Sequence, residues 1–86
     1  MEIKYVWCVK THIVRDYETI TDDVSLFNSL EDAARFFGKV VDEERKLATE
    51  NEWVIAYDDN YNFEAYEEGY YAKNHSYVSL FEIPIK

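Results

Sequence analysis

The sequence predicts an α+β fold, in which one long amphipathic helix packs on one face of a mostly antiparallel sheet of about five strands. Two observations lead to this fold class. Residues 28–51 carry apolar side chains at intervals of three and four, the spacing of a single buried helical face. The segments before and after are short and rich in β-branched and aromatic residues, as strands are. With 86 residues the chain is too short for two cores, so residues 1–86 are expected to form a single domain in the order β-β-α-β-β-β.

The helix is expected to begin after Ser29, whose hydroxyl is placed to accept a hydrogen bond from the backbone N–H of Asp32. Glu31 and Asp32 lie in the first turn, where the helix dipole favours negative charge. Phe36 lies beside the apolar stripe, so it either widens the core or is exposed to a partner. The stripe itself consists of Leu30, Ala33, Ala34, Phe37, Val40, Val41, Leu47 and Ala48.

The strands are expected at residues 2–14, 24–27, 52–57, 62–68 and 77–83. The polar residues 15–23 are expected to form a turn or an irregular link between the first two strands. Residues 58–60 have the sequence Asp-Asp-Asn, a strong turn signal, and residues 70–76 are expected to form a loop. Pro84 cannot donate to a sheet ladder, so the last residues are expected at an edge of the sheet or beyond it.

Composition and charge argue against several classes of protein. The net charge of −9, from 18 acids and 9 bases, repels nucleic acid and anionic membranes and attracts basic surfaces. Cys8 is the only cysteine, which excludes an intramolecular disulfide and fits a reducing cytosol. No apolar run approaches the roughly 20 residues of a membrane span, and the first residues lack a signal-peptide pattern. We therefore expect a cytoplasmic protein.

No pattern in the sequence indicates catalysis, a cofactor or a metal ion. Cys8 and His12 would share a strand face, but about 13 Å apart, which is too far for two ligands of one metal. Residues 58–62 match the start of a calcium loop, yet Phe63 stands where that loop needs glycine. The sequence has no Gly-rich phosphate loop and no Ser–His–acid spacing. A protein that is not an enzyme is therefore expected.

The leading functional hypothesis rests on acids that alternate with tyrosines in the second half of the chain. Residues 42–68 contain ten acids and two bases. Regular negative charge with flat rings nearby resembles the outline of a nucleic acid, which suits the basic groove of a nuclease or other DNA- or RNA-handling enzyme. We therefore predict a nucleic-acid mimic, an inhibitor such as the anti-CRISPR and anti-restriction proteins of phages and mobile elements. The residues expected to contact the partner are Asp58, Asp59, Glu64, Tyr66, Glu67, Glu68 and Tyr70.

Three other hypotheses remain open at this point, the last of which is an enzyme or small-ligand binder that would need a closed pocket holding Cys8, His12 or a carboxylate pair. In the first, the acids only keep the protein soluble and the tyrosines are cross-strand packing pairs. In the second, the protein is an assembly module that dimerises or docks through the second face of its sheet, because one helix cannot cover all its large aromatic residues. These residues are Tyr5, Trp7, Trp53, Tyr57, Tyr66, Tyr77 and Phe81.

Overall fold

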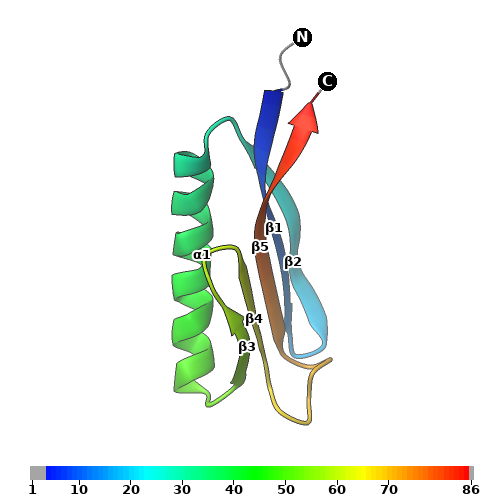
Figure 1. Cartoon of the computed structure of the whole chain (residues 1–86). Coiled ribbons are helices and arrows are strands. Elements are labelled where there is room, and N and C mark those ends of the chain that lie inside the picture. The colour runs from blue at the N-terminus through cyan, green and yellow to red at the C-terminus, as the bar shows by residue number, and fades with distance from the viewer. Residues whose placement is uncertain (1–3, 86) are drawn as a thin grey trace.

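The computed structural model describes residues 4–85, in which one helix lies along one face of a five-stranded antiparallel sheet (Figure 1). Across the sheet the strand order is β2-β1-β5-β4-β3. The predicted fold class and the order β-β-α-β-β-β are therefore confirmed. The elements are β1 (Lys4–Arg15), β2 (Glu18–Phe27), α1 (Leu30–Glu50), β3 (Val54–Asp58), β4 (Asn62–Tyr66) and β5 (His75–Ile85).

β1 and β2 form a long hairpin, in which the turn expected within residues 15–23 is confined to two residues and the rest of that segment, expected to be a turn or an irregular link, belongs to the strands. Only Asp16 and Tyr17 connect the two strands, and Arg15 pairs with Glu18. Asp16 and Tyr17 have φ angles of 50° and 69°, the left-handed values that both central residues of a type I′ hairpin turn adopt. Because neither residue is glycine, the usual hairpin signal is missing from the sequence.

The last strand is longer than predicted, because β5 runs from His75 to Ile85 rather than over residues 77–83. From His75 to Ser79 it pairs with β1 on one side and β4 on the other. Beyond Leu80, the described register continues with β1 alone. Pro84, which pairs with Tyr5, therefore lies at an edge of the sheet, as expected.

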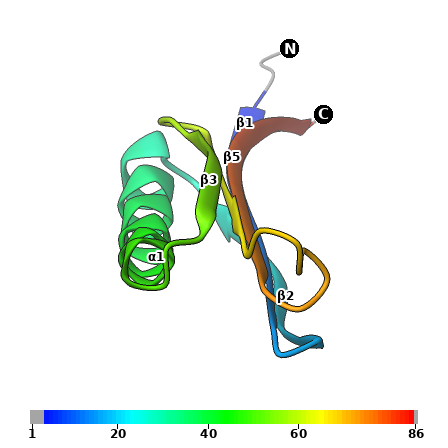
Figure 2. The same ribbon diagram turned by 90° about the horizontal axis from the view of Figure 1, so that it is seen from below.

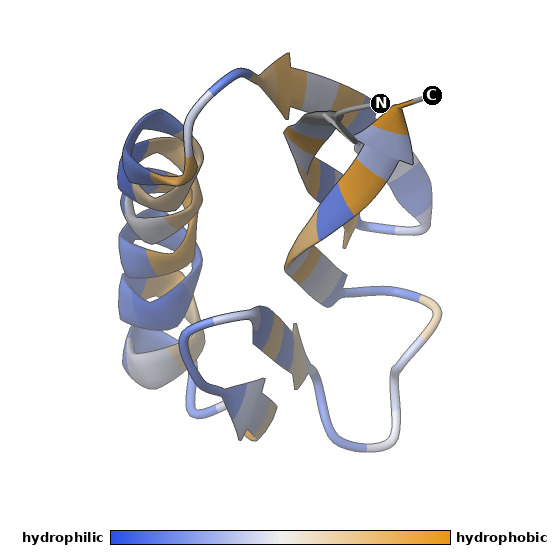
Figure 3. Cartoon of the chain, turned by 45° about the horizontal axis from the view of Figure 1, so that its top comes forward, coloured by the Kyte–Doolittle hydropathy of each residue, from blue (hydrophilic) through white to orange (hydrophobic). Residues whose placement is uncertain are grey.

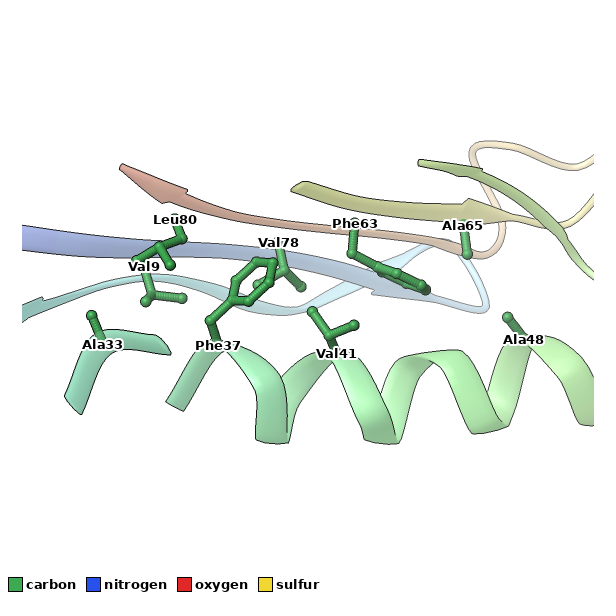
Figure 4. Packing of buried hydrophobic residues seen from close by; sticks show 9 residues of the cluster. All are labelled: Val9, Ala33, Phe37, Val41, Ala48, Phe63, Ala65, Val78 and Leu80. Carbon is green, nitrogen blue, oxygen red and sulfur yellow. The ribbon is translucent and has the colours of Figure 1, made fainter. Parts of the chain in front are cut away.

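The core lies between α1 and the sheet (Figure 4). The apolar side of α1 faces the strands and its hydrophilic side faces outward (Figure 3). Each large apolar side chain buried in this layer contributes roughly 1.5–3 kcal/mol, which holds the helix in place. Phe36 widens the core rather than facing a partner, because its ring packs on Phe27 with 5.4 Å between centroids. The buried cluster consists of Ala33, Phe37, Val41 and Ala48 from α1 and Val9, Phe63, Ala65, Val78 and Leu80 from the sheet.

Ser29 caps the N-terminus of α1 as predicted. Its side-chain hydroxyl accepts a hydrogen bond from the backbone N–H of Asp32 at 3.2 Å. At the other end, the Asn51 N–H donates to the Leu47 carbonyl at 3.1 Å, which closes the last turn. Both ends of α1 are therefore set by hydrogen bonds between residues that are close in the sequence.

Among residues 4–85, no helix or strand covers the face of the sheet opposite α1 (Figure 2). At one end of this open face lie four exposed apolar side chains around Cys8, which is only 1% exposed. Of the large aromatic residues expected to exceed what the helix can cover, Trp7 and Trp53 pack against the core beside α1, whereas Tyr66, Tyr77 and Phe81 lie on the open face. Of these three, only Phe81 pairs with Cys8. The patch is therefore mostly aliphatic. We call it the open-face patch, and it consists of Val24, Leu26, Phe81 and Ile83.

Candidate protein-interaction surface

The seven predicted contact residues lie in three separate places. Asp58 and Asp59 lie where β3 turns into β4, near α1. Glu64 and Tyr66 lie on β4, where they pair with Tyr77 and His75 of β5. Glu67, Glu68 and Tyr70 follow β4, about 13 Å or more from the first pair, given 3.3 Å per strand residue. β4 thus separates the two ends of the predicted set.

Asp58 is held by an arginine of the helix. Arg45 donates from Nε and NH2 to the two carboxylate oxygens of Asp58, at 2.7 and 2.6 Å, and from NH1 to Asp42 at 2.7 Å. These hydrogen bonds from Arg45 hold the pKa of Asp58 below its usual range. The charge of Asp58 is therefore balanced within the molecule, where it ties β3 to α1.

Asp59 shapes the turn between β3 and β4. Its Oδ1 accepts hydrogen bonds from the backbone N–H groups of Tyr61 and Asn62, at 2.8 and 2.7 Å. This is the self-capping geometry for which aspartate is favoured in turns. The turn predicted around residues 58–60 is therefore present, and it uses one of the predicted contact carboxylates.

Glu64 belongs to a hydrogen-bonded cluster on the open face. Its Oε2 lies 2.8 Å from His75 Nε2 and accepts from the Tyr71 hydroxyl at 3.0 Å. The Tyr71 hydroxyl also lies 2.8 Å from His75 Nε2, and burial, together with the neighbouring Glu64, raises the pKa of Tyr71. Tyr66 packs beside Tyr71, with 5.3 Å between ring centroids. Oε2 of Glu64 is thus directed to groups of the same chain.

Asn74 joins the β1–β2 turn to the loop between β4 and β5. It is only 7% exposed, and its Oδ1 accepts from the backbone N–H of Asp16 at 3.3 Å. Its Nδ2 donates to Glu67 Oε1 at 2.7 Å, and the Tyr17 N–H donates to the Lys73 carbonyl at 3.0 Å. The turn and the loop consequently lie side by side at the lower end of the molecule in Figure 1.

This end of the molecule combines exposed tyrosine rings with carboxylates. Three tyrosines here are more than half exposed, Tyr17 at 66%. Within the described residues, the carboxylates of Asp16, Glu18 and Glu68 have no ion-pair or side-chain hydrogen-bond partner. The basic residue of the loop, Lys73, lies over a tyrosine ring at 5.8 Å. We call this surface the acidic tyrosine-rich end, and it consists of Asp16, Tyr17, Glu18, Glu68, Tyr70 and Tyr71.

Sequence reasoning found only part of this surface. Glu68 and Tyr70 were among the predicted contacts, whereas Asp16, Tyr17 and Glu18 were assigned to a turn or an irregular link. The signal that was available is the run of acids without a base that starts at Asp16. Nothing in the local sequence indicates that this run lies against a loop more than fifty residues later.

Comparison with known proteins finds no matching family model, no matching curated protein and no matching solved structure. Between residues 4 and 85, no helix has the length and apolar content needed to cross a membrane. In the same part of the chain, no three His, Cys, Asp or Glu side chains gather as ligands of a metal ion. The functional argument therefore rests on the surface itself.

Proposed function

We propose that this protein is a small inhibitor that enters the basic nucleic-acid groove of a nuclease or other DNA- or RNA-handling enzyme with its acidic tyrosine-rich end. The observation that carries the proposal is that unpartnered carboxylates and exposed tyrosine rings occupy the same end of the molecule. A groove that binds nucleic acid offers basic side chains for phosphates and apolar surfaces on which bases stack. Carboxylates and flat rings complement both features.

Charge and shape support the proposal in the same direction. A net charge of −9 on 86 residues steers the protein toward a basic groove and speeds association. The molecule measures 50 × 20 × 16 Å, a narrow rod. Tyrosine rings add contact area that loses little conformational entropy on binding.

The proposal assigns different roles to the seven predicted contacts. Glu68 and Tyr70 contact the partner directly, joined by Tyr17 and Glu18 of the β1–β2 hairpin. The other five predicted contacts hold the surface in shape through hydrogen bonds or ring packing within the chain. These are Asp58, Asp59, Glu64, Tyr66 and Glu67.

The test is an affinity capture from a nuclease-treated bacterial lysate, with salt-stepped elution and mass spectrometry. We expect a DNA- or RNA-handling enzyme that elutes at moderate salt and is displaced by added DNA. The variant Glu18→Lys/Glu68→Lys should weaken capture about tenfold or more. The control Glu31→Lys/Glu82→Lys makes the same change in net charge elsewhere on the molecule and should capture normally. A partner that resists both DNA and the Glu18→Lys/Glu68→Lys change would refute the proposal.

A second candidate function is an assembly module, and the open-face patch favours it. Val24 and Leu26 are 60% and 62% exposed, next to exposed Phe81 and Ile83. Adjoining apolar side chains on a surface mark sites of association. This candidate predicts a concentration-dependent dimer that is insensitive to salt and is lost in Leu26→Ser. Sedimentation at two salt concentrations separates it from the inhibitor proposal, which needs no dimer.

A further inference from the structure

The two edges of the sheet differ in length and regularity. β3, at one edge, has five residues, and its pairing with β4 is interrupted by one extra residue, Ala56. β2, at the other edge, has ten residues, and its extra residue, Ile20, lies close to the turn. Residues 21–27 therefore pair in regular register with β1 on one side, and no strand from the described part of the chain, residues 4–85, pairs with them on the other. Such an edge leaves backbone N–H and C=O groups free to pair with another chain.

Several features that keep natural edge strands from pairing are missing from β2. Proteins protect their edges with proline, with lysine, with bulges or with very short strands. Residues 18–27 contain no proline, no lysine and no arginine, and the single irregularity is confined to the turn end. The charged residues of the strand are Glu18, Asp22 and Asp23. The strand is thus open to a partner, and to one of opposite charge in particular.

On the side of α1, the edge of β2 opens into a groove of about 200 Å³. Apolar side chains of β1 and α1 line it, among them Ile13 and Val40, together with hydroxyls from Thr21 and Ser25. The carboxylates of Asp23 and Glu43 also line the groove, and neither has an ion-pair partner within the described residues. An apolar floor with carboxylates beside it fits the aliphatic stem and charged head of a lysine or arginine.

On the opposite side, the same edge presents Val24 and Leu26 of the open-face patch. Side chains alternate along a strand, so an added strand directs every second residue into the groove and the others over this patch. The residues of the added strand that enter the groove should therefore be basic, and those that lie over the open-face patch should be apolar. Residues on one side of an added strand repeat at roughly 7 Å, which matches the spacing within β2 itself.

We propose that the edge of β2 binds an extended segment of a partner protein in which basic and apolar residues alternate, and that this segment adds a sixth strand to the sheet. Backbone hydrogen bonds hold the added strand, and the two kinds of side-chain site select its sequence. This site is distinct from the acidic tyrosine-rich end, and the inference does not depend on the inhibitor proposal.

A second copy of this chain is a poor occupant of the same edge. A two-fold axis at Asp22 or Asp23 places that carboxylate directly opposite its own copy, and an axis at Val24 still brings together two strands that each carry three acids and no base. Like charges directly opposite each other destabilise a strand pair, and β2 holds no base to balance them. The occupant that fits the charges is therefore a basic segment of another protein.

The test uses a synthetic peptide, acetyl-Lys-Val-Lys-Val-Lys-Val-Lys-amide, titrated into the ¹⁵N-labelled protein while amide shifts are recorded. We expect the largest shifts in residues 21–27 and around Glu43. A peptide of the same composition with its lysines and valines in two blocks should bind about tenfold more weakly. Two further alternating peptides carry N-methyl groups, the first along one edge of its backbone and the second along the opposite edge. One of these two peptides should also bind about tenfold more weakly, because the added strand pairs with β2 through one backbone edge only.

Paired variants separate specific docking from general attraction by charge. Asp23→Lys/Glu43→Lys should lower the peptide affinity about tenfold, whereas Glu50→Lys/Glu52→Lys, with the same change in charge, should change it less than about twofold. Tyr17→Ala should leave it unchanged, which distinguishes this site from the acidic tyrosine-rich end. Equal losses in both charge variants, shifts centred on β3, full binding by both methylated peptides, or no binding at about 1 mM would each overturn the inference.

Discussion

Tyr17 occupies a left-handed backbone conformation, so its replacement by glycine should stabilise the fold. Its φ angle is 69°, and for a residue with a side chain this region costs about 1–2 kcal/mol. Glycine recovers that cost but makes the unfolded chain more flexible, which offsets about 0.4–1 kcal/mol. The side chain is 66% exposed, so little packing is lost with it. We expect a net gain of about 0.5–1 kcal/mol in the free energy of unfolding.

The assay is urea unfolding at 25 °C, followed by a thermal melt. In a domain of this size, 1 kcal/mol corresponds to a shift of about 4–8 °C in Tm. Tyr17→Ala serves as the comparison, because it removes the ring but keeps the left-handed strain. Tyr5, which lies in β1, gives the matched control, where Tyr5→Gly should be less stable than Tyr5→Ala.

The reasoning is refuted if Tyr17→Gly is no more stable than Tyr17→Ala. Such a result would show that the φ angle at position 17 carries no strain to relieve. The two variants also bear on function, since both remove a ring of the acidic tyrosine-rich end. Partner capture should fall in both, although the glycine variant is the more stable protein, so lost binding cannot be attributed to unfolding.

Three further perturbations test the interactions that build the fold and its surface. Asn74→Asp places a carboxylate against Glu67 and should lower the free energy of unfolding at pH 7 by about 1–3 kcal/mol, measured by urea titration. Asp58→Asn removes a carboxyl whose pKa is held low by Arg45. The resulting loss in the free energy of unfolding should have its full value at pH 6 and should vanish in strong acid, well below about pH 4, where the carboxyl is protonated in both states. In an Arg45→Gln background, the same change should cost little at either pH. Phe63→Ala empties a fully buried site and should cost about 3–5 kcal/mol, visible as a large fall in Tm.

The helix and the fold class could be predicted because their causes are local. Apolar residues at intervals of three and four define the buried face of α1. Ser29 caps its N-terminus by accepting from the N–H of Asp32, three residues later. Strand alternation likewise places Phe63 and Ala65 on one face of the strand expected at residues 62–68, and both are fully buried in the structure. Each of these signals lies within a few neighbouring residues, which is the range over which a sequence pattern can be interpreted directly.

The hairpin turn and the candidate surface depended on contacts between distant parts of the chain. Tyr17 is an unfavourable residue for a type I′ turn, whereas Asp16 tolerates the left-handed region. The backbone N–H groups of both residues donate to Asn74 and Lys73, more than fifty residues away. Two of the predicted contact carboxylates also depend on distant residues. Arg45 of the helix binds Asp58, and His75 of β5 binds Glu64, only once the sheet and the helix have assembled. The sequence alone determined how much acid and tyrosine the protein carries. Which of these groups remain free for a partner was decided by tertiary structure, since hydrogen bonds between distant residues bind some carboxylates and leave others exposed.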